Sequence, residues 1–142
     1  MADKAVLDNL MELATRFRRA IDRSDRDQLG IAFKDFPAGS CGDTVIMLKS
    51  YLSTCGIKPL VRVCGQRREK SHAWLESDGL IIDITADQFE DCGDSVIVTR
   101  ESDWHDTFKH DFESEENIRR YDPDTDNRLS RAYEEVLKHI QL

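Results

Sequence analysis

The sequence predicts an α+β domain in which helices pack on a small antiparallel sheet. Amphipathic helical patterns occupy both ends of the chain. Between them lie short segments rich in β-branched and aromatic residues, separated by turn-forming residues. A length of 142 residues suits one hydrophobic core, so we expect a single domain over residues 1–142.

Each end of the chain is predicted to form a helix, because apolar residues recur there at intervals of three and four. The first helix is expected from about Asp3 to Arg23, followed by a charged loop that ends at Gly30. Its apolar stripe comprises Val6, Leu10, Leu13, Phe17 and Ile21. The stripe of the last helix comprises Leu129, Ala132, Tyr133, Val136, Leu137 and Ile140.

Another helix is predicted to begin at Cys41 and to end at Gly56. One face of it carries residues spaced four, three, four and three positions apart, namely Cys41, Val45, Leu48, Leu52 and Cys55. Ser40 has the chemistry of an N-cap, and Asp43 completes a start that resembles a capping box. Cys41 is therefore expected in the first turn of a helix.

The segments KPLVRVCG, SHAWLES and GLIIDIT are predicted to be strands, and DSVIVTR to be a fourth. Asp78 and Gly79 favour a two-residue hairpin turn, in which paired residue numbers sum to 157. His72 and Asp83 are then diagonal neighbours on one face of the sheet. A three-residue loop would move Asp83 to the opposite face. The acidic stretch from Asp111 to Asp126 is expected to be a surface loop with room for one short helix.

Cys41, His72 and Asp83 are the candidate catalytic residues. The reference thiol pKa of ~8.5 falls at a helix N-terminus or beside a protonated imidazole, and the thiolate is the nucleophilic form. Unpaired N–H groups of the first helical turn could bind a developing oxyanion. His72 could take the thiol proton, and Asp83 could hold the imidazole in one orientation.

The order of these motifs resembles the transglutaminase-like branch of the papain-like cysteine peptidase superfamily. The likeness covers roughly residues 36–89: S-C-G-D at a helix start, then S-H-A-W-L-E and I-I-D-I-T in successive strands. It implies that Cys41 is the nucleophile, His72 the general base and Asp83 the residue that orients it. It also implies a nucleophile-bearing helix packed on the sheet. The short spacing between Cys41 and His72 fits a compact, bacterial-type member better than a multidomain enzyme.

The expected function is cysteine-dependent acyl transfer through a thioester at Cys41. Peptidase, amidase, deamidase and transglutaminase chemistry all fit, so the substrate is expected to be a peptide, a protein side chain or a small amide or ester. Two alternatives stay open. The chain could be an inactive interaction module with the same fold, or a redox sensor in which Cys64 or Cys92 resolves an oxidised Cys41.

Other residues receive less specific interpretations. Trp74 is expected in the core, where it could also line a substrate cleft. Gln88 is expected to cap a strand end and could also donate to an oxyanion. The remaining histidines are interpreted as surface or loop residues: His105, His110 and His139. Cys55 and Cys64 are interpreted as small buried apolar residues, and all four cysteines as free thiols.

The composition argues against several other classes of protein. The net charge of −8 disfavours nucleic acid as a partner, and the basic cluster Arg67, Arg68 and Lys70 is interpreted as a solvated loop. The Cys and His residues show no C-x-x-C or H-x-x-x-H spacing, so we expect no metal site and no cofactor.

No apolar run approaches the ~18 residues of a membrane span, and an apolar signal stretch is missing at the start. We therefore expect a cytoplasmic protein without membrane contact, with export by a route that needs no N-terminal signal left open. The oligomeric state is not predicted.

Overall fold

The computed structural model describes residues 2–114 and 123–140, which form an α+β domain. The helices are α1 (Ala2–Arg23), α2 (Arg26–Leu29), α3 (Cys41–Thr54), α4 (Asp103–Asp106) and α5 (Pro123–Lys138). Two 3-10 turns are η1 (Ile31–Phe33) and η2 (Ala86–Gln88). The strands are β1 (Val61–Arg67), β2 (Lys70–Ser77), β3 (Leu80–Asp83), β4 (Ile97–Thr99) and β5 (Lys109–Ser114).

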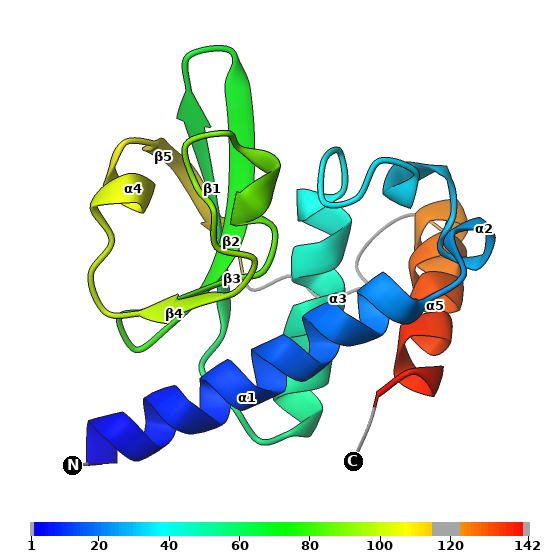
Figure 1. The fold of residues 1–142 in the computed structure, drawn as a ribbon, viewed down its shortest axis with the longest axis horizontal. Helices are drawn as coiled ribbons and strands as arrows, with labels where there is room; N and C mark the ends of the chain where they lie inside the picture. Colours follow the sequence, from blue (N-terminus) through cyan, green and yellow to red (C-terminus); the bar gives the residue numbers. More distant parts are fainter. Residues whose placement is uncertain (1, 115–122, 141–142) are drawn as a thin grey trace.

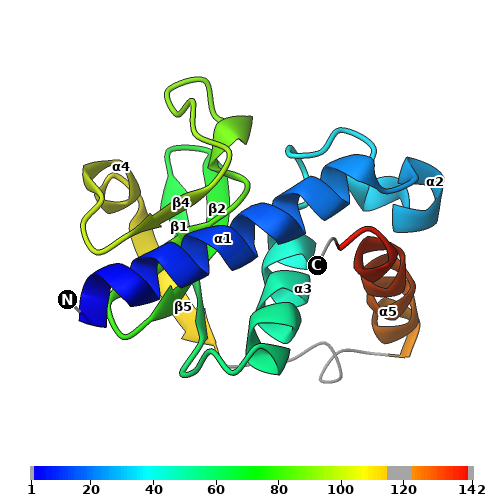
Figure 2. The ribbon, with the colours of Figure 1, turned by 60° about the horizontal axis from the view of Figure 1, so that its bottom comes forward.

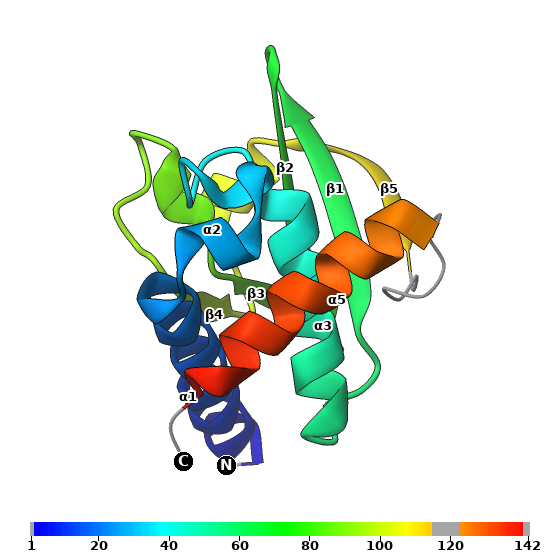
Figure 3. The ribbon, with the colours of Figure 1, turned by 90° about the vertical axis from the view of Figure 1, so that its right-hand side faces the viewer.

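Within the described residues the strands form one antiparallel sheet of five, in the order β4-β3-β2-β1-β5. One face of the sheet is covered by α3, and α5 packs on the outer side of α3. In Figure 3 these two helices lie in front of the sheet. Helix α1 crosses α3 and reaches the β4 edge of the sheet (Figure 2). Helix α4 lies on the other side of the sheet (Figure 1).

Both faces of the sheet are buried, so successive residues of β2 enter different cores. Ala73 and Leu75 join the main core between the sheet and the helices. Trp74 joins a smaller cluster on the opposite face, together with Val63, Ile81, Phe89 and Phe108. The alternation therefore separates a helix-facing core from an aromatic core, and His72 follows Trp74 to the aromatic side.

The N-terminal prediction is confirmed in its main features. Helix α1 spans the expected residues, and Leu10, Phe17 and Ile21 of its stripe are buried, although Val6 near the start is 44% exposed. The expected loop before Gly30 instead contains α2, whose N-cap Asp25 accepts a hydrogen bond from the backbone N–H of Asp27.

Helix α3 begins and ends where predicted, but its first turn lacks the expected capping box. Ser40 makes no side-chain capping bond, because its backbone is not in the extended conformation that an N-cap serine normally adopts. Asp43 instead forms an ion pair with Arg128 of α5. A tertiary contact therefore replaces the predicted local one.

The end of α3 also differs in one respect. Gly56 has a φ of +86°, and the N–H of Ile57 donates to Leu52, which is a Schellman ending. Cys55 precedes this turn and is exposed, so its interpretation as a buried residue was wrong. Cys64 is half-buried, and all four cysteines are free thiols.

The acidic stretch after Asp111 was only partly understood from the sequence. Residues 109–114 form β5, which pairs with β1, and α5 already begins at Pro123. The remainder of the predicted loop, residues 115–122, lies outside the described residues. The strand was not predicted because its composition is charged. A strand at an open sheet edge depends on backbone hydrogen bonds more than on apolar side chains.

The C-terminal stripe is buried at Leu129, Ala132 and Val136, whereas Leu137 is 40% exposed. None of the described helices combines the length and apolar character that crossing a membrane requires.

Candidate active site

The turn at Asp78 and Gly79 has the predicted two-residue form. Both residues have positive φ, 48° and 82°, as a type I′ turn requires. Ser77 pairs with Leu80 and Leu75 pairs with Ile82, which is the register expected from the sequence. His72 therefore lies where β2 runs past the end of β3, beside the chain that leaves Asp83.

His72 and Asp83 meet as the register predicts. His72 Nε2 lies 2.7 Å from Asp83 Oδ2, and both side chains are fully buried. The second carboxylate oxygen, Oδ1, accepts the backbone N–H of Thr85 at 3.0 Å. This contact to the residue two positions later is the usual way in which an Asp side chain fixes a turn.

The electrostatics favour a charged pair. Burial alone would raise the pKa of Asp83, but hydrogen bonds from His105 and His72 outweigh it and lower the pKa to about 2. Burial alone would lower the pKa of His72, but hydrogen bonds with Asp83 and Cys41 raise it to about 9. The arrangement therefore holds a carboxylate and favours an imidazolium beside it.

Cys41 lies in the first turn of α3, as predicted, and is half-buried. Its side chain is one of the groups that raise the pKa of His72, which brings the thiol within hydrogen-bond reach of that ring. His72 Nε2 is already bonded to Asp83, so Nδ1 is the nitrogen that can exchange a proton with the thiol. Cys41 is the first residue of α3, and the N–H groups of a first helical turn have no acceptor within the helix.

Gln88, in η2, has its side-chain amide close to the same nitrogen of His72, Nδ1. Its Nε2 donates to Thr85 O at 3.1 Å and lies 3.2 Å from His72 Nδ1. The first contact agrees with the predicted cap at the strand end. The second is a hydrogen bond only when His72 is neutral, because the protonated Nδ1 of the favoured imidazolium and the amide would both be donors. The bond to Thr85 O holds one amide proton of Gln88 at the strand end in either state.

His105 is the residue that the sequence interpretation missed. It was expected at the surface, but it is 1% exposed, and its Nε2 lies 2.7 Å from Asp83 Oδ2. Ser102 caps α4 and also contacts the His105 ring, with Oγ 2.6 Å from Nδ1. The S-D-W-H segment signals a helix start. Nothing local in it indicates that α4 packs over Asp83.

The other two histidines are closer to expectation. His110 is exposed, whereas His139 is half-buried and bonded to Glu135 at 2.9 Å. Neither of them contacts Asp83. Among the described histidines, His105 is therefore the only one besides His72 that bonds to this carboxylate.

Aromatic rings surround His72 on the side of the sheet that faces α4. The ring centroid of Phe89 lies 5.1 Å away, and those of Trp74, Trp104 and Phe108 lie 5.7 Å away. Trp74 has no exposed surface, which agrees with its predicted core role, and it offers no surface to a substrate in this arrangement. The rings keep water from the His72–Asp83 pair and so strengthen its electrostatic interaction.

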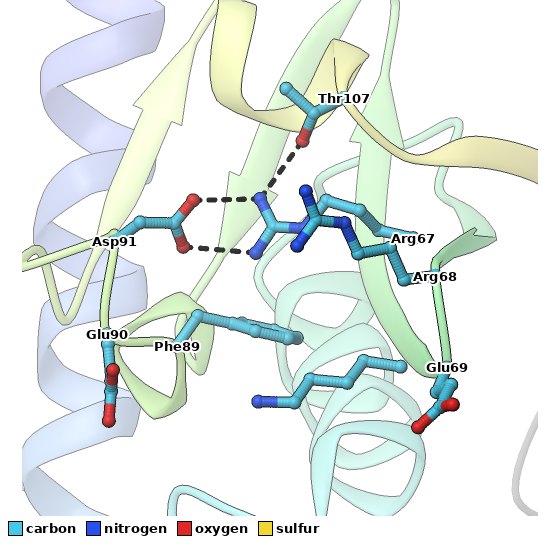
Figure 4. Close-up of a pocket in the computed structure, with 8 residues that line it drawn as sticks. Arg67, Arg68, Glu69, Phe89, Glu90, Asp91 and Thr107 are labelled. Atoms are coloured by element: carbon cyan, nitrogen blue, oxygen red, sulfur yellow. Dashed lines mark hydrogen bonds and ion pairs between the residues drawn. The ribbon is translucent and has the colours of Figure 1, made fainter.

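A cavity of about 740 Å³ opens on the outer side of Phe89 (Figure 4). Arg67 makes two hydrogen bonds to Asp91, at 2.9 and 3.0 Å, and its guanidinium stacks 5.3 Å from the Phe89 ring centre. Arg67 was interpreted as part of a solvated loop, but it is half-buried and holds the wall of this cavity. Phe89 separates the cavity from His72, and neither Cys41 nor His72 lines it.

Three of the buried residues could in principle hold a metal ion. His72, Asp83 and His105 each offer one ligand atom, and these atoms lie within 4.8 Å of one another. Two ligands bonded to a tetrahedral zinc ion at ~2.1 Å would be roughly 3.4 Å apart. The two nitrogen–oxygen distances of 2.7 Å are instead those of hydrogen bonds to a shared carboxylate oxygen.

No protein-family model, curated protein or solved structure matches the chain.

The His72–Asp83 pair makes stability depend on pH. His72 binds its proton more tightly in the folded state, with a pKa of about 9 against 6.5 in the unfolded chain. The resulting stabilisation is complete below pH 6.5 and is lost as the pH rises toward 9. We expect the free energy of unfolding to fall over this window by on the order of 3 kcal/mol, measured by urea unfolding under reducing conditions.

The control is His72→Gln, which cannot titrate in this range. Its free energy of unfolding should change much less between pH 6.5 and pH 9. Equal pH dependence in the two proteins would contradict the raised pKa of His72.

Proposed function

We propose that the protein is a cysteine-dependent acyl-transfer enzyme of the transglutaminase-like or papain-like kind, with Cys41 as nucleophile, His72 as general base and acid, and Asp83 as the residue that orients His72. One observation carries this proposal. Three residues chosen from sequence spacing come together in the order of a triad: His72 Nε2 lies 2.7 Å from Asp83 Oδ2, and the Cys41 side chain is among the groups that raise the pKa of His72.

The chemistry follows from which nitrogen is occupied. Asp83 accepts the proton on Nε2, so Nδ1 takes the proton of the Cys41 thiol. The thiolate sulfur attacks the carbonyl carbon of an amide or ester, and the electron pair of the C=O bond moves to oxygen. The N–H groups in the first turn of α3 are the available donors for that oxyanion.

Collapse of this intermediate re-forms the carbonyl and breaks the bond to the leaving group. The leaving nitrogen or oxygen takes the proton from His72 Nδ1, and the acyl group stays on Cys41 as a thioester. Water or an amine then attacks the thioester while His72 accepts its proton. The carbonyl re-forms as the C–S bond breaks, and the sulfur takes the proton from His72 Nδ1, which restores the Cys41 thiol. Hydrolases and transferases differ only in this second nucleophile.

The proposal is tested by alkylating the protein with iodoacetamide over a range of pH and quantifying each cysteine by mass spectrometry. Cys55 is an exposed thiol at the far end of α3 and serves as the internal control. We expect half-maximal alkylation of Cys41 well below the ~8.5 of an ordinary thiol, and a return toward that value in His72→Ala. Cys55 should be unchanged in both proteins.

A second readout tests acyl transfer itself. Incubation with p-nitrophenyl acetate should leave an acetyl group on Cys41 and release p-nitrophenol in a burst. An inactive interaction module predicts that Cys41 follows Cys55 at every pH and acquires no acetyl group. That result would overturn the proposal. A disulfide from Cys41 to Cys64 or Cys92 after mild peroxide would instead support the redox sensor.

A further inference from the structure

A second imidazole contacts the carboxylate that orients His72, and a simple triad does not require it. Asp83 Oδ2 lies 2.7 Å from His72 Nε2 and also 2.7 Å from His105 Nε2. All three side chains are at most 1% exposed. His105 comes from α4, which is separated from the β2–β3 hairpin by β4, so two distant parts of the chain converge on one oxygen atom.

The proton on His105 can be assigned from its neighbours. Ser102 Oγ accepts the backbone N–H of His105 at 3.1 Å, and its hydroxyl proton can be donated to the ring nitrogen Nδ1 at 2.6 Å. Nδ1 is then an acceptor, so the proton of the neutral ring is on Nε2. In this tautomer His105 donates to Asp83 through Nε2.

Asp83 is thus held by two donors that take no part in proton transfer. The backbone N–H of Thr85 fixes Oδ1, and His105 fixes Oδ2. Two bonds on different oxygens fix both the position and the plane of the carboxylate. His72 then meets a preorganised acceptor at Nε2, which leaves Nδ1 for Cys41.

We infer that His105 is a positioning residue, which holds the Asp83 carboxylate in place so that His72 keeps Nδ1 toward Cys41, with Ser102 setting its tautomer. This inference rests on the proposed function. It adds a fourth and a fifth residue, His105 and Ser102, to the site. It also explains why a polar residue occupies a position surrounded by aromatic rings, with the Trp74 ring centre 4.7 Å and the Trp104 ring centre 4.8 Å away.

The test compares His105→Leu with His105→Gln. Leucine fills much of the space but donates no hydrogen bond, so the buried carboxylate loses one of the bonds that stabilise its charge. Glutamine can bring an amide N–H close to the position of Nε2. We expect half-maximal alkylation of Cys41 to rise by about one pH unit in His105→Leu, a roughly tenfold loss of rate on the acidic side. His105→Gln should stay close to wild type.

A matched control is His139→Leu, which removes a histidine–carboxylate bond, to Glu135, elsewhere in the fold. It should leave the Cys41 profile unchanged. A folded His105→Leu with the wild-type profile would overturn the inference, as would equal shifts in the Leu and Gln variants, because packing alone would then explain the residue.

The same measurements distinguish failure of the proposed function from failure of the positioning role of His105. If wild-type Cys41 already follows Cys55, the proposed function fails. If wild-type Cys41 differs from Cys55 but His105→Leu matches wild type, only the positioning role fails. Should His105→Leu not fold, Ser102→Ala gives the answer, because it releases His105 Nδ1 while keeping the ring. An unchanged Cys41 profile in that variant would overturn the role of the Ser102–His105 pair.

Discussion

Alkylation of Cys41 at pH 6.5 is expected to fall 10- to 100-fold when Asp83 is replaced by Asn. A thiol with the reference pKa of ~8.5 is only about 1% ionised at that pH, so loss of the His72 ion pair removes most of the reactive form. Turnover of an amide substrate is expected to fall further, by about 10⁴-fold, which is the typical effect of removing the carboxylate from a catalytic triad.

The physical cause is the change at His72. Burial lowers the pKa of His72, and bonds with Asp83 and Cys41 overcome that effect to raise it to about 9. Asparagine cannot supply the charge, so burial prevails and the ring stays neutral at pH 7. The amide also brings N–H groups toward His72, His105 or the N–H of Thr85, where Asp83 only accepted hydrogen bonds.

Glu135→Gln is the matched control for this substitution. Glu135 is also a buried carboxylate bonded to a histidine, His139, but it lies in α5. Its replacement should leave the rate of Cys41 alkylation unchanged. A wild-type rate in a folded Asp83→Asn protein would rule out Asp83 as the orienting residue and, with it, the proposed triad.

Replacement of Gly65 by Val is expected to lower the free energy of unfolding by about 3 kcal/mol, as overpacking of a rigid core does. Gly65 pairs with His72 across β1 and β2. A Cβ atom there would lie 2.9 Å from the Cβ of Phe108 and 3.3 Å from Cη2 of Trp74. The first distance is too short for two carbon atoms and involves an atom next to the backbone of Phe108, which cannot simply rotate away.

The effect should reach the site as well as the fold. Trp74 and Phe108 both pack against the His72 ring, so displacing them exposes the His72–Asp83 pair to water. Urea unfolding monitored by tryptophan fluorescence measures the stability change. Gly93→Val is the control, because a Cβ at Gly93 meets nothing within 4 Å. Similar unfolding midpoints for Gly65→Val and wild type would show that the close packing at Gly65 is not a constraint.

Much of the site could be predicted because it depends on local backbone chemistry. Asp78-Gly79 determines the turn, the turn determines the register, and the register places His72 and Asp83 on one face. The start of α3 at Cys41 was equally accessible from the apolar spacing along the helix. These features involve neighbours a few residues apart, where conformational preference is strong enough to be read from residue type.

The details of the cap at Cys41 were not accessible in the same way. Ser40 and Asp43 match a capping pattern, yet Asp43 pairs with Arg128, which is far away in the sequence. A charge-assisted bond to α5 competes with a local bond of similar strength, and only the packing of α5 against the start of α3 decides between them.

The sequence alone therefore determined the helix that carries Cys41, the hairpin that carries His72 and Asp83, and the α+β class that joins them. Only the tertiary structure decided that α4 brings His105 onto Asp83, that β5 extends the sheet and that Arg67 holds the cavity wall. The physical reason is range. Turns and helix starts follow from contacts within a few residues, whereas the position of His105 depends on how distant elements share one buried space.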